Sequence, residues 1–330
     1  MKKMYIIGVD ISKNTFDFHC YGHSVTPEPV TNNAKGFRQF EKWMKLQVSK
    51  AKQEVLIVME YTGIYTYNIE RFLDEHGWQY VKRPALDIKR SSGMQRGKTD
   101  STDARMISKY GWMHKEMLTP MKPLNDTLVE LQQLMSCRDK LVTDKASHVA
   151  RLKELKEQMG DRLSEQVNKS ACFIIDVLTV EINEFEKAIK QCLAKDENQQ
   201  RNYDLLISIR GIGFVIAVTL IITTENFTRF DSHRKFACYC GVAPFMHTSG
   251  TSIRGKTRVS QLANKKIKSL LTMAAFVAVQ YDADLKTKYE QKIKQGKPKM
   301  SAINIIRAKL IERIYTVIKR QTPYILKAAA

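Results

Sequence analysis

Cysteine, proline and long apolar runs are scarce in this chain. Its 330 residues include six cysteines and eight prolines. The cysteines are irregularly spaced and form no Cys-x-x-Cys pair, which argues against a structural zinc site or a disulfide framework and favours reduced thiols. The most apolar run, Phe214 to Ile222, is well short of the roughly 18 residues that a transmembrane helix needs. No signal-peptide cleavage site follows the first apolar stretch, so we expect a cytoplasmic protein without a membrane span.

Acidic residues are also in deficit. Lys and Arg number 54 against 34 Asp and Glu, which gives a net charge of +20 at pH 7. From residue 245 to residue 330, 18 Lys and Arg stand against only 4 Asp and Glu. A surplus of this size is typical of proteins that bind a polyanion, either nucleic acid or an anionic membrane surface. The hydrophobic fraction of 43% is ordinary for a globular protein, which argues against disorder along the whole chain.

Residue patterns divide the chain into three regions. Residues 1–122 alternate strand-like and helix-like runs, which predicts an α/β domain. The expected elements include strands at Tyr5–Val9, Thr15–Cys20 and Val55–Met59 and a helix after Asn33. In residues 123–200 an apolar residue recurs every seven positions, and Gly160, the one glycine, predicts a break between two helical runs. This stripe predicts long helices that form either an ordinary helical hairpin or a coiled-coil oligomerisation arm. Residues 201–330 are predicted to be mainly helical and strongly basic, with a helix-hairpin-helix-like turn at the sequence Ile209-Arg-Gly-Ile-Gly213.

Four acids in the first region could carry chemistry. Asp10 and Glu60 each directly follow an apolar strand-like run, and the carboxyl ends of strands are where α/β sheets build sites. Asp100 and Asp103 lie three apart at a predicted helix start and so share one helix face. Taken singly, each acid is better explained as a helix cap or a turn residue. The ordered set of four favours a site for Mg²⁺, which would answer the repulsion among the carboxylates.

Other groups suit phosphate or a nucleic-acid backbone. Ser249 stands beside Gly250 and is followed by three cations, but serine–glycine turns are common and the pattern by itself is weak. Gly211 and Gly213 either offer free N–H groups at a helix start or form a plain turn between core helices. The basic residues form either solvated charged segments or backbone contacts. These candidates are Lys82, Arg83, Lys89, Arg90, Arg96, Lys98, Arg254, Lys256 and Arg258.

Taken in order, these residues resemble the insertion-sequence-110 family of transposases, the RNA-guided enzymes also called bridge recombinases. Three N-terminal blocks resemble its RuvC-like (RNase H-like) DEDD domain: Gly8-Val-Asp10-Ile-Ser-Lys13, Met59-Glu60-Tyr-Thr-Gly63 and Lys98-Thr-Asp100-Ser-Thr-Asp103-Ala104. Three later blocks resemble its transposase domain: Ile209-Arg-Gly-Ile-Gly213, Gly241-Val-Ala-Pro244 and Ser249-Gly250.

The resemblance implies a role for each acid and for the serine. Asp10, Glu60, Asp100 and Asp103 would bind Mg²⁺, and Ser249 would be the nucleophile that links covalently to a cleaved DNA strand. Donor and target DNA, a non-coding bridge RNA and a homo-oligomer (a dimer or tetramer) are the implied partners, at the bacterial nucleoid. A site-specific DNA invertase of the same family is an alternative. From the residues alone, a hydrolytic structure-selective nuclease and a non-catalytic nucleic-acid scaffold also stay open.

Overall fold

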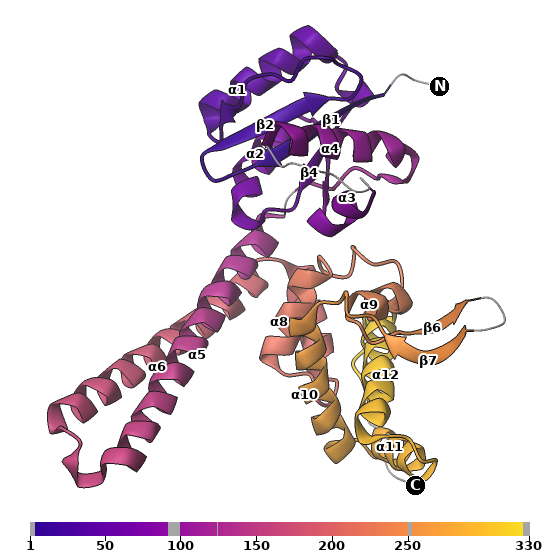
Figure 1. Ribbon diagram of the computed structural model, residues 1–330. Helices are drawn as coiled ribbons and strands as arrows, with labels where there is room; N and C mark the ends of the chain where they lie inside the picture. The colour runs from indigo at the N-terminus through magenta and orange to yellow at the C-terminus, as the bar shows by residue number, and fades with distance from the viewer. Residues whose placement is uncertain (1–3, 92–99, 124, 250–252, 326–330) are drawn as a thin grey trace. The chain divides into compact units, whose positions relative to one another are not determined.

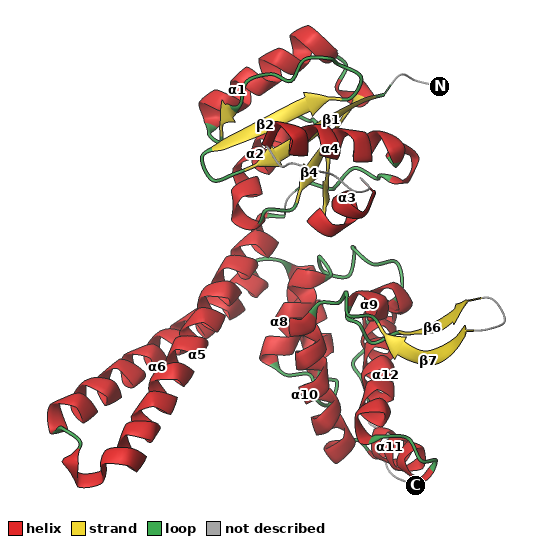
Figure 2. Cartoon of the chain, viewed as in Figure 1, coloured by secondary structure: helices red, strands yellow, loops and turns green. Residues whose placement is uncertain are grey.

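The computed structural model describes residues 4–91, 100–123, 125–249 and 253–325 (Figure 1). Contacts divide the chain into two units, Met1–Asn125 and Asp126–Ala330. The first unit is built of strands and helices in alternation (Figure 2). Its strands are β1 (Tyr5–Ile11), β2 (Thr15–Cys20), β3 (Val30–Thr31), β4 (Val55–Glu60) and β5 (Gln79–Arg83), and its α-helices are α1 (Ala34–Trp43), α2 (Tyr67–Glu75), α3 (Ala85–Ser91) and α4 (Asp100–Met113).

The five strands form one mixed sheet in the order β3-β2-β1-β4-β5. β1 pairs with β2 antiparallel and with β4 parallel, and β4 pairs with β5 parallel. The strands predicted from Tyr5, Thr15 and Val55 are all present. The helix predicted after Asn33 also forms, and the Asn33 side chain caps it by accepting hydrogen bonds from the backbone N–H groups of Lys35 and Gly36.

Both faces of the central strands are buried, which explains why β4 is an uninterrupted apolar run. One face carries Ile7 and Val9 and packs against α1 and α2 in a single buried cluster. The other face carries Ile6 and Val58 and packs against α3 and α4 in a second cluster. The sheet is therefore the middle of three layers, as the RNase H-like prediction requires.

The second unit begins with two long antiparallel helices. The α-helices are α5 (Asp126–Met159), α6 (Glu165–Ala194), α7 (Glu197–Ile207), α8 (Phe214–Thr223), α9 (His233–Tyr239), α10 (Lys265–Tyr281), α11 (Ala283–Lys294) and α12 (Lys299–Arg320). α5 and α6 pack against each other along their length and join at Gly160, where the sequence predicted a break. The start of α5 and the end of α6 share a buried core with α7, α8, α10 and α12.

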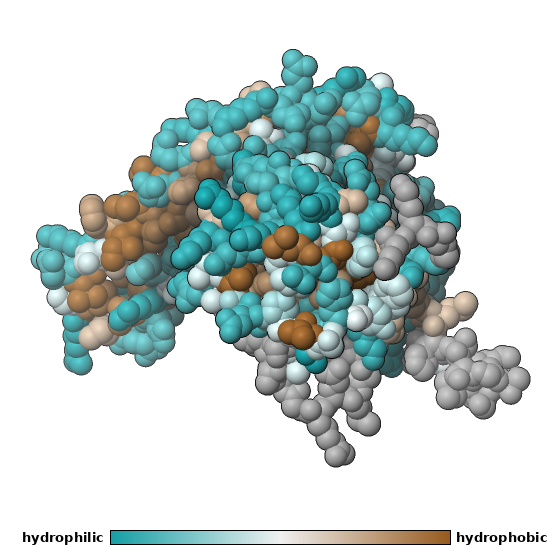
Figure 3. All heavy atoms as spheres, turned by 90° about the horizontal axis from the view of Figure 1, so that it is seen from above, coloured by the Kyte–Doolittle hydropathy of each residue, from teal (hydrophilic) through white to brown (hydrophobic). Residues whose placement is uncertain are grey.

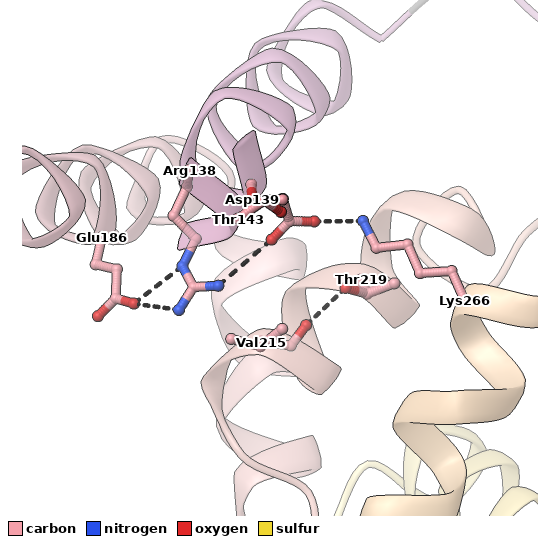
Figure 4. Close-up of polar contacts among 7 residues, drawn as sticks. All are labelled: Arg138, Asp139, Thr143, Glu186, Val215, Thr219 and Lys266. Carbon is pink, nitrogen blue, oxygen red and sulfur yellow. Dashed lines mark hydrogen bonds and ion pairs between the residues drawn. The ribbon is translucent and has the colours of Figure 1, made fainter. Parts of the chain in front are cut away.

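A polar cluster also ties the helical pair to the rest of this unit (Figure 4). Arg138 of α5 donates two hydrogen bonds to Glu186 of α6, at 3.0 and 2.8 Å. Next to it, Asp139 of α5 pairs with Lys266 of α10. The Arg138 contact therefore joins α5 to α6, and the Asp139–Lys266 pair joins α5 to α10.

The last third contains one feature beyond the predicted helices. Strands β6 (Pro244–Ser249) and β7 (Ile253–Val259) form an antiparallel hairpin between α9 and α10. β-Branched residues such as Thr248, Thr257 and Val259 favour extended backbone, and Gly250 follows the first strand. With this addition the predicted fold class is confirmed: an RNase H-like α/β domain, paired long helices and a mainly helical C-terminal region. Within the described ranges, no helix has the length and apolar character needed to cross a membrane.

Candidate active site

Asp10 and Glu60 lie at the same end of two neighbouring parallel strands. Val9 of β1 is opposite Met59 of β4, so Asp10 and Glu60 are the next pair along the ladder. Neighbouring strands are about 4.8 Å apart, and successive side chains point to opposite faces. Both acids therefore share the face that α4 covers, and both are half-buried.

Helix α4 crosses β1 closely because glycines remove side chains from the crossing. A Cβ on Gly8 would lie 2.2 Å from the backbone nitrogen of Ser108 and 2.4 Å from the carbonyl oxygen of Ala104. A Cβ on Gly111 would lie 2.6 Å from a methyl group of Ile6. Gly111 thus contacts Ile6, near the start of β1, whereas Ala104 and Ser108 contact Gly8, nearer its carboxyl end. From Gly111 back to Ala104, α4 therefore runs toward the carboxyl end of β1. The first turn of α4 is directed toward the strand end that carries Asp10.

This first turn contains the other two predicted acids. Asp100 begins α4, and Asp103, on the same turn, is half-buried. The Asp100 side chain lies outside the described part of the structure. Among the side chains that are described, no three His, Cys, Asp or Glu residues form a group that could hold a metal ion.

The donor chemistry of Asp10 and Glu60 fits a divalent cation. Two carboxylates about 5 Å apart repel each other by roughly 3 kcal/mol at an effective dielectric constant near 20. Carboxylate oxygens are the ligands that hard cations such as Mg²⁺ prefer, and a cation between two acids removes their repulsion. Asp103 lies on the first turn of α4, the helix that covers this face of the sheet.

A fifth acid, Asp17, lies beside this pair and was not selected in the sequence analysis. It is directly opposite Asp10 in the β1–β2 ladder, and only 8% of it is exposed. Residues directly opposite each other share a face, so Asp17 also lies on the α4 side. Its signal in the sequence is an acid inside an alternating apolar strand, Thr15-Phe-Asp-Phe-His-Cys20.

His19 fixes β2 to α4 two residues further along the same face. Its Nδ1 lies 2.9 Å from the hydroxyl of Ser108, and its Nε2 lies 3.0 Å from the carbonyl oxygen of His23. Burial lowers the pKa of His19, and the nearby charge of Arg105 lowers it further. The neutral imidazole therefore serves as a structural link between the sheet and the helix that carries Asp103.

The basic residues expected near the carboxylates have different environments. Lys82 differs from the expectation because its ammonium lies 2.7 Å from Glu70, a carboxylate that is only 2% exposed. Since Lys82 already neutralises this buried charge, it is not a free contact for a phosphate. Arg83 is opposite Glu60 in the β4–β5 ladder, and its Nε is buried without a hydrogen-bond partner.

The remaining basic candidates of this unit lie on or after α3. Lys89 and Arg90 are exposed in the last turn of α3, where they are accessible to a polyanion. Arg96 and Lys98 lie outside the described residues. For the exposed cations of α3 and the half-buried Arg83, backbone binding stays a prediction.

Ser249 is the last residue of β6 and pairs with Ile253 of β7. The register pairs Thr248, not Ser249, with Arg254, so the ladder places no cation directly opposite the serine. Arg258 is exposed near the other end of β7. The side chains of Ser249, Arg254 and Lys256 are outside the described part of the structure.

The two glycines of the predicted helix-hairpin-helix turn differ in role. Gly211 has φ +92°, and a Cβ there would lie 2.4 Å from the carbonyl oxygen of Ala274 in α10. This close approach is the plain turn between core helices that was one of the two alternatives. Gly213 caps α8, and a Cβ there would have no atom within 4 Å. The phosphate-binding alternative therefore remains for Gly213.

Comparison with known proteins identifies both units. Residues 7–159 match a family described as transposase, of the IS110 DEDD type. Residues 203–290 match the transposase IS116/IS110/IS902 family. The chain is 27% identical to the pilin gene-inverting protein of Moraxella bovis over 333 residues, which is 98% of each chain. It is 21% identical to the transposase for insertion sequence element IS1328 of Yersinia enterocolitica over 304 residues, or 85% of each chain.

An RNase H-like domain of the DEDD type, joined to a second transposase domain, defines an enzyme of the transposase class that acts on DNA. A DEDD domain uses divalent metal ions, which agrees with the donor chemistry of Asp10 and Glu60. The protein belongs to the IS110 family of transposases, and the resemblance found in the sequence is confirmed.

Proposed function

We propose that this protein cleaves and exchanges DNA strands of a mobile element through a covalent intermediate on Ser249. In this proposal Asp10, Glu60, Asp100 and Asp103 hold Mg²⁺. The observation that carries it is the placement of Asp10 and Glu60 on adjacent strand ends, on the face toward which the first turn of α4 is directed.

The chemistry conserves one phosphodiester bond. The Ser249 oxygen attacks the phosphorus, a serine–phosphate bond forms, and the bond to the leaving DNA oxygen breaks. The serine proton leaves to a base, and the leaving oxygen gains a proton. A hydroxyl of another strand then attacks the serine ester and restores the serine, so no ATP is required. When bound, Mg²⁺ supplies positive charge that neutralises the phosphate and stabilises the leaving oxygen.

A covalent-adduct assay tests this mechanism. Protein, RNA, labelled DNA and Mg²⁺ are incubated, denatured, and examined for labelled protein. We expect an adduct with the wild type and none with Ser249→Ala. Ser252→Ala is the matched control, because it removes a hydroxyl three residues away in the same sequence segment. An adduct from Ser249→Ala would disprove the serine mechanism, and cleavage without any adduct would support a hydrolytic nuclease.

The carboxylates are tested separately from DNA binding. Asp10→Asn removes one charge from the proposed metal site while it keeps the size of the side chain. We expect loss of cleavage with little change in DNA affinity, measured by fluorescence anisotropy. Full cleavage by Asp10→Asn would support a scaffold with the chemistry elsewhere.

We propose that α5 and α6 form the oligomerisation arm of a homo-oligomer. Phe173, Val177 and Val180 follow one face of α6 at helical spacing and are 68%, 43% and 58% exposed. We call these three residues the arm stripe. Apolar (brown) surface gathers on this helical pair in Figure 3. Contiguous exposed apolar surface of this kind marks an interface.

A bridge RNA is the proposed second partner. The adduct assay, repeated without RNA, tests whether the RNA is required.

Site-specific inversion is the second candidate function. The observation that favours it is the similarity to the pilin gene-inverting proteins of Moraxella bovis and Moraxella lacunata, over 98% of each chain. A plasmid that carries a candidate element distinguishes the two. Excision and integration of the element would support transposition, whereas reversal of an internal segment in place would support inversion.

A further inference from the structure

Helix α12 contains a buried cation that no acid in the described ranges neutralises. Arg307 is only 5% exposed, and its Nε is buried without a hydrogen-bond partner. Within the described residues, the one hydrogen bond of its side chain donates from Nη1 to the side-chain oxygen of Asn304, at 3.1 Å. Within the described residues, no carboxylate pairs with Arg307. A buried charge with an unused donor is costly unless a ligand completes it.

Another arginine in the same helix is paired with a buried carboxylate, which is the usual arrangement for a buried cation. Arg313 is also largely buried, and its Nη1 lies 2.6 Å from the carboxylate of Asp282, which is 1% exposed. In the part of the chain that the structure describes, the fold thus supplies a buried counter-charge for Arg313 and none for Arg307. The paired Arg313 and Arg307, which has no carboxylate partner among the residues described, lie within two turns of the same helix. The burial of Arg307 without such a partner is therefore not a general property of α12.

A second cation lies close to Arg307. Lys268 of α10 is half-buried and, among the described side chains, makes no ion pair. Burial lowers its pKa, and the charge of Arg307 lowers it further. Burial also lowers the pKa of Arg307. Two neighbouring cations, of which the charge of one lowers the pKa of the other, are expected where an anion binds between them.

These cations lie at the base of the β6–β7 hairpin. Asn304, which accepts from Arg307, donates to the backbone carbonyl oxygen of Val242 at 2.9 Å. Val242 precedes β6 by two residues, and α10 begins shortly after β7 ends. Three separate segments, the turn before β6, the start of α10 and the middle of α12, therefore meet at this point.

We propose that Arg307 and Lys268 bind a backbone phosphate of DNA at the base of this hairpin. The Arg307 guanidinium suits a phosphate because its planar N–H donors match phosphate oxygens. Ser249 is five residues beyond the start of β6, or roughly 17 Å along the strand. The site therefore holds flanking DNA rather than the strand end at Ser249. This proposal rests on the proposed function only in that the ligand of the site is DNA.

Binding of labelled duplex DNA at several salt concentrations tests this proposal without any cleavage. Arg307→Met and Lys268→Met should each weaken binding roughly tenfold, the effect of losing one charge-assisted contact. The slope of log affinity against log salt should fall by about 0.9 for each lost phosphate contact. Lys309→Met is the matched control, because it removes an exposed cation of the same helix. Arg307→Lys should restore part of the affinity.

Thermal unfolding excludes a purely structural role. Because no carboxylate among the described residues pairs with Arg307, Arg307→Met should unfold at the same or a higher temperature than the wild type. Loss of affinity together with a lower unfolding temperature in both Arg307→Met and Arg307→Lys would overturn the proposal. Unchanged affinity and slope would also overturn it. If inorganic phosphate at constant ionic strength stabilises the wild type but not Arg307→Met, while DNA affinity is unchanged, the ligand is free phosphate and the DNA assignment is wrong.

A failed Ser249 adduct test would leave this result untouched, since binding is measured before any chemistry. Conversely, a wild-type adduct with normal DNA affinity in Arg307→Met would support the proposed function and reject this site. The two proposals can therefore fail independently.

Discussion

Replacing Gly8 by alanine places a methyl group where α4 crosses β1. The new Cβ would lie 2.2 Å from the backbone nitrogen of Ser108 and 2.4 Å from the carbonyl oxygen of Ala104. Neither atom can rotate away as a side chain would, so the whole helix must move. Overpacking in a core costs typically about 1–3 kcal/mol. Because both contacts are with backbone, we expect Gly8→Ala to lower the free energy of unfolding by about 3 kcal/mol.

The three tryptophans allow the free energy of unfolding of the first unit to be measured by itself. Trp43, Trp78 and Trp112 all lie in Met1–Asn125, so tryptophan fluorescence during urea unfolding reports on the sheet domain alone. Gly111→Ala is the matched control. Its Cβ would meet side-chain methyl groups of Ile6 and Val58, rather than backbone, at 2.6 and 2.8 Å, and alanine gains about 1 kcal/mol of helix propensity over glycine. We expect a net loss below about 2 kcal/mol for this control.

The same substitution should also impair cleavage. Moving α4 away from β1 shifts its first turn, which carries Asp103, relative to Asp10. We therefore expect Gly8→Ala to lose DNA cleavage at temperatures at which it is still folded, while Gly111→Ala retains most of it. Equal unfolding free energies for Gly8→Ala and the wild type would refute the close crossing of α4 and β1, and with it the proposed approach of the four acids.

Three further predictions concern pH, salt and assembly. The pKa of His19 is lowered from its ordinary value of 6.5 by burial, so the unfolded chain binds a proton more readily than the folded one. The stability that this neutral histidine contributes is complete above pH 6.5 and is lost as the pH falls toward the lowered pKa of His19 in the folded state. Unfolding of the wild type, monitored by tryptophan fluorescence, should show this loss of stability. His19→Gln should not show it. DNA affinity should fall by roughly 10³–10⁵ between 50 and 200 mM salt if 6–10 phosphates are contacted, and a flat salt response in anisotropy would argue against nucleic-acid binding. Phe173→Ser with Val180→Ser should lower the oligomeric mass measured by light scattering, whereas Ile64→Ser, at a residue that is 82% exposed in the other unit, should leave it unchanged.

Local patterns in the sequence were sufficient for most of the secondary structure. The apolar runs before Asp10 and Glu60 predicted the central strands, because strands buried on both faces have no polar alternation. Asn33 marked a helix start through its capping side chain, and Gly160 marked the turn between the two long helices. The hairpin β6–β7 was not predicted, since its short strands lie in a region whose dominant pattern is helical.

The sequence by itself determined which acids are candidates for the chemistry and in what order they come, because these acids follow recognisable strand ends and helix starts. Only the tertiary structure decided which of the charged residues share a site. Pairing across β1 and β2 placed Asp17 opposite Asp10, and packing of α2 on the sheet gave Lys82 a buried partner in Glu70. Likewise, Arg307 is one of many cations in the sequence, and only its burial without a carboxylate distinguishes it. Strand register and burial depend on contacts between distant segments, which local residue patterns do not contain.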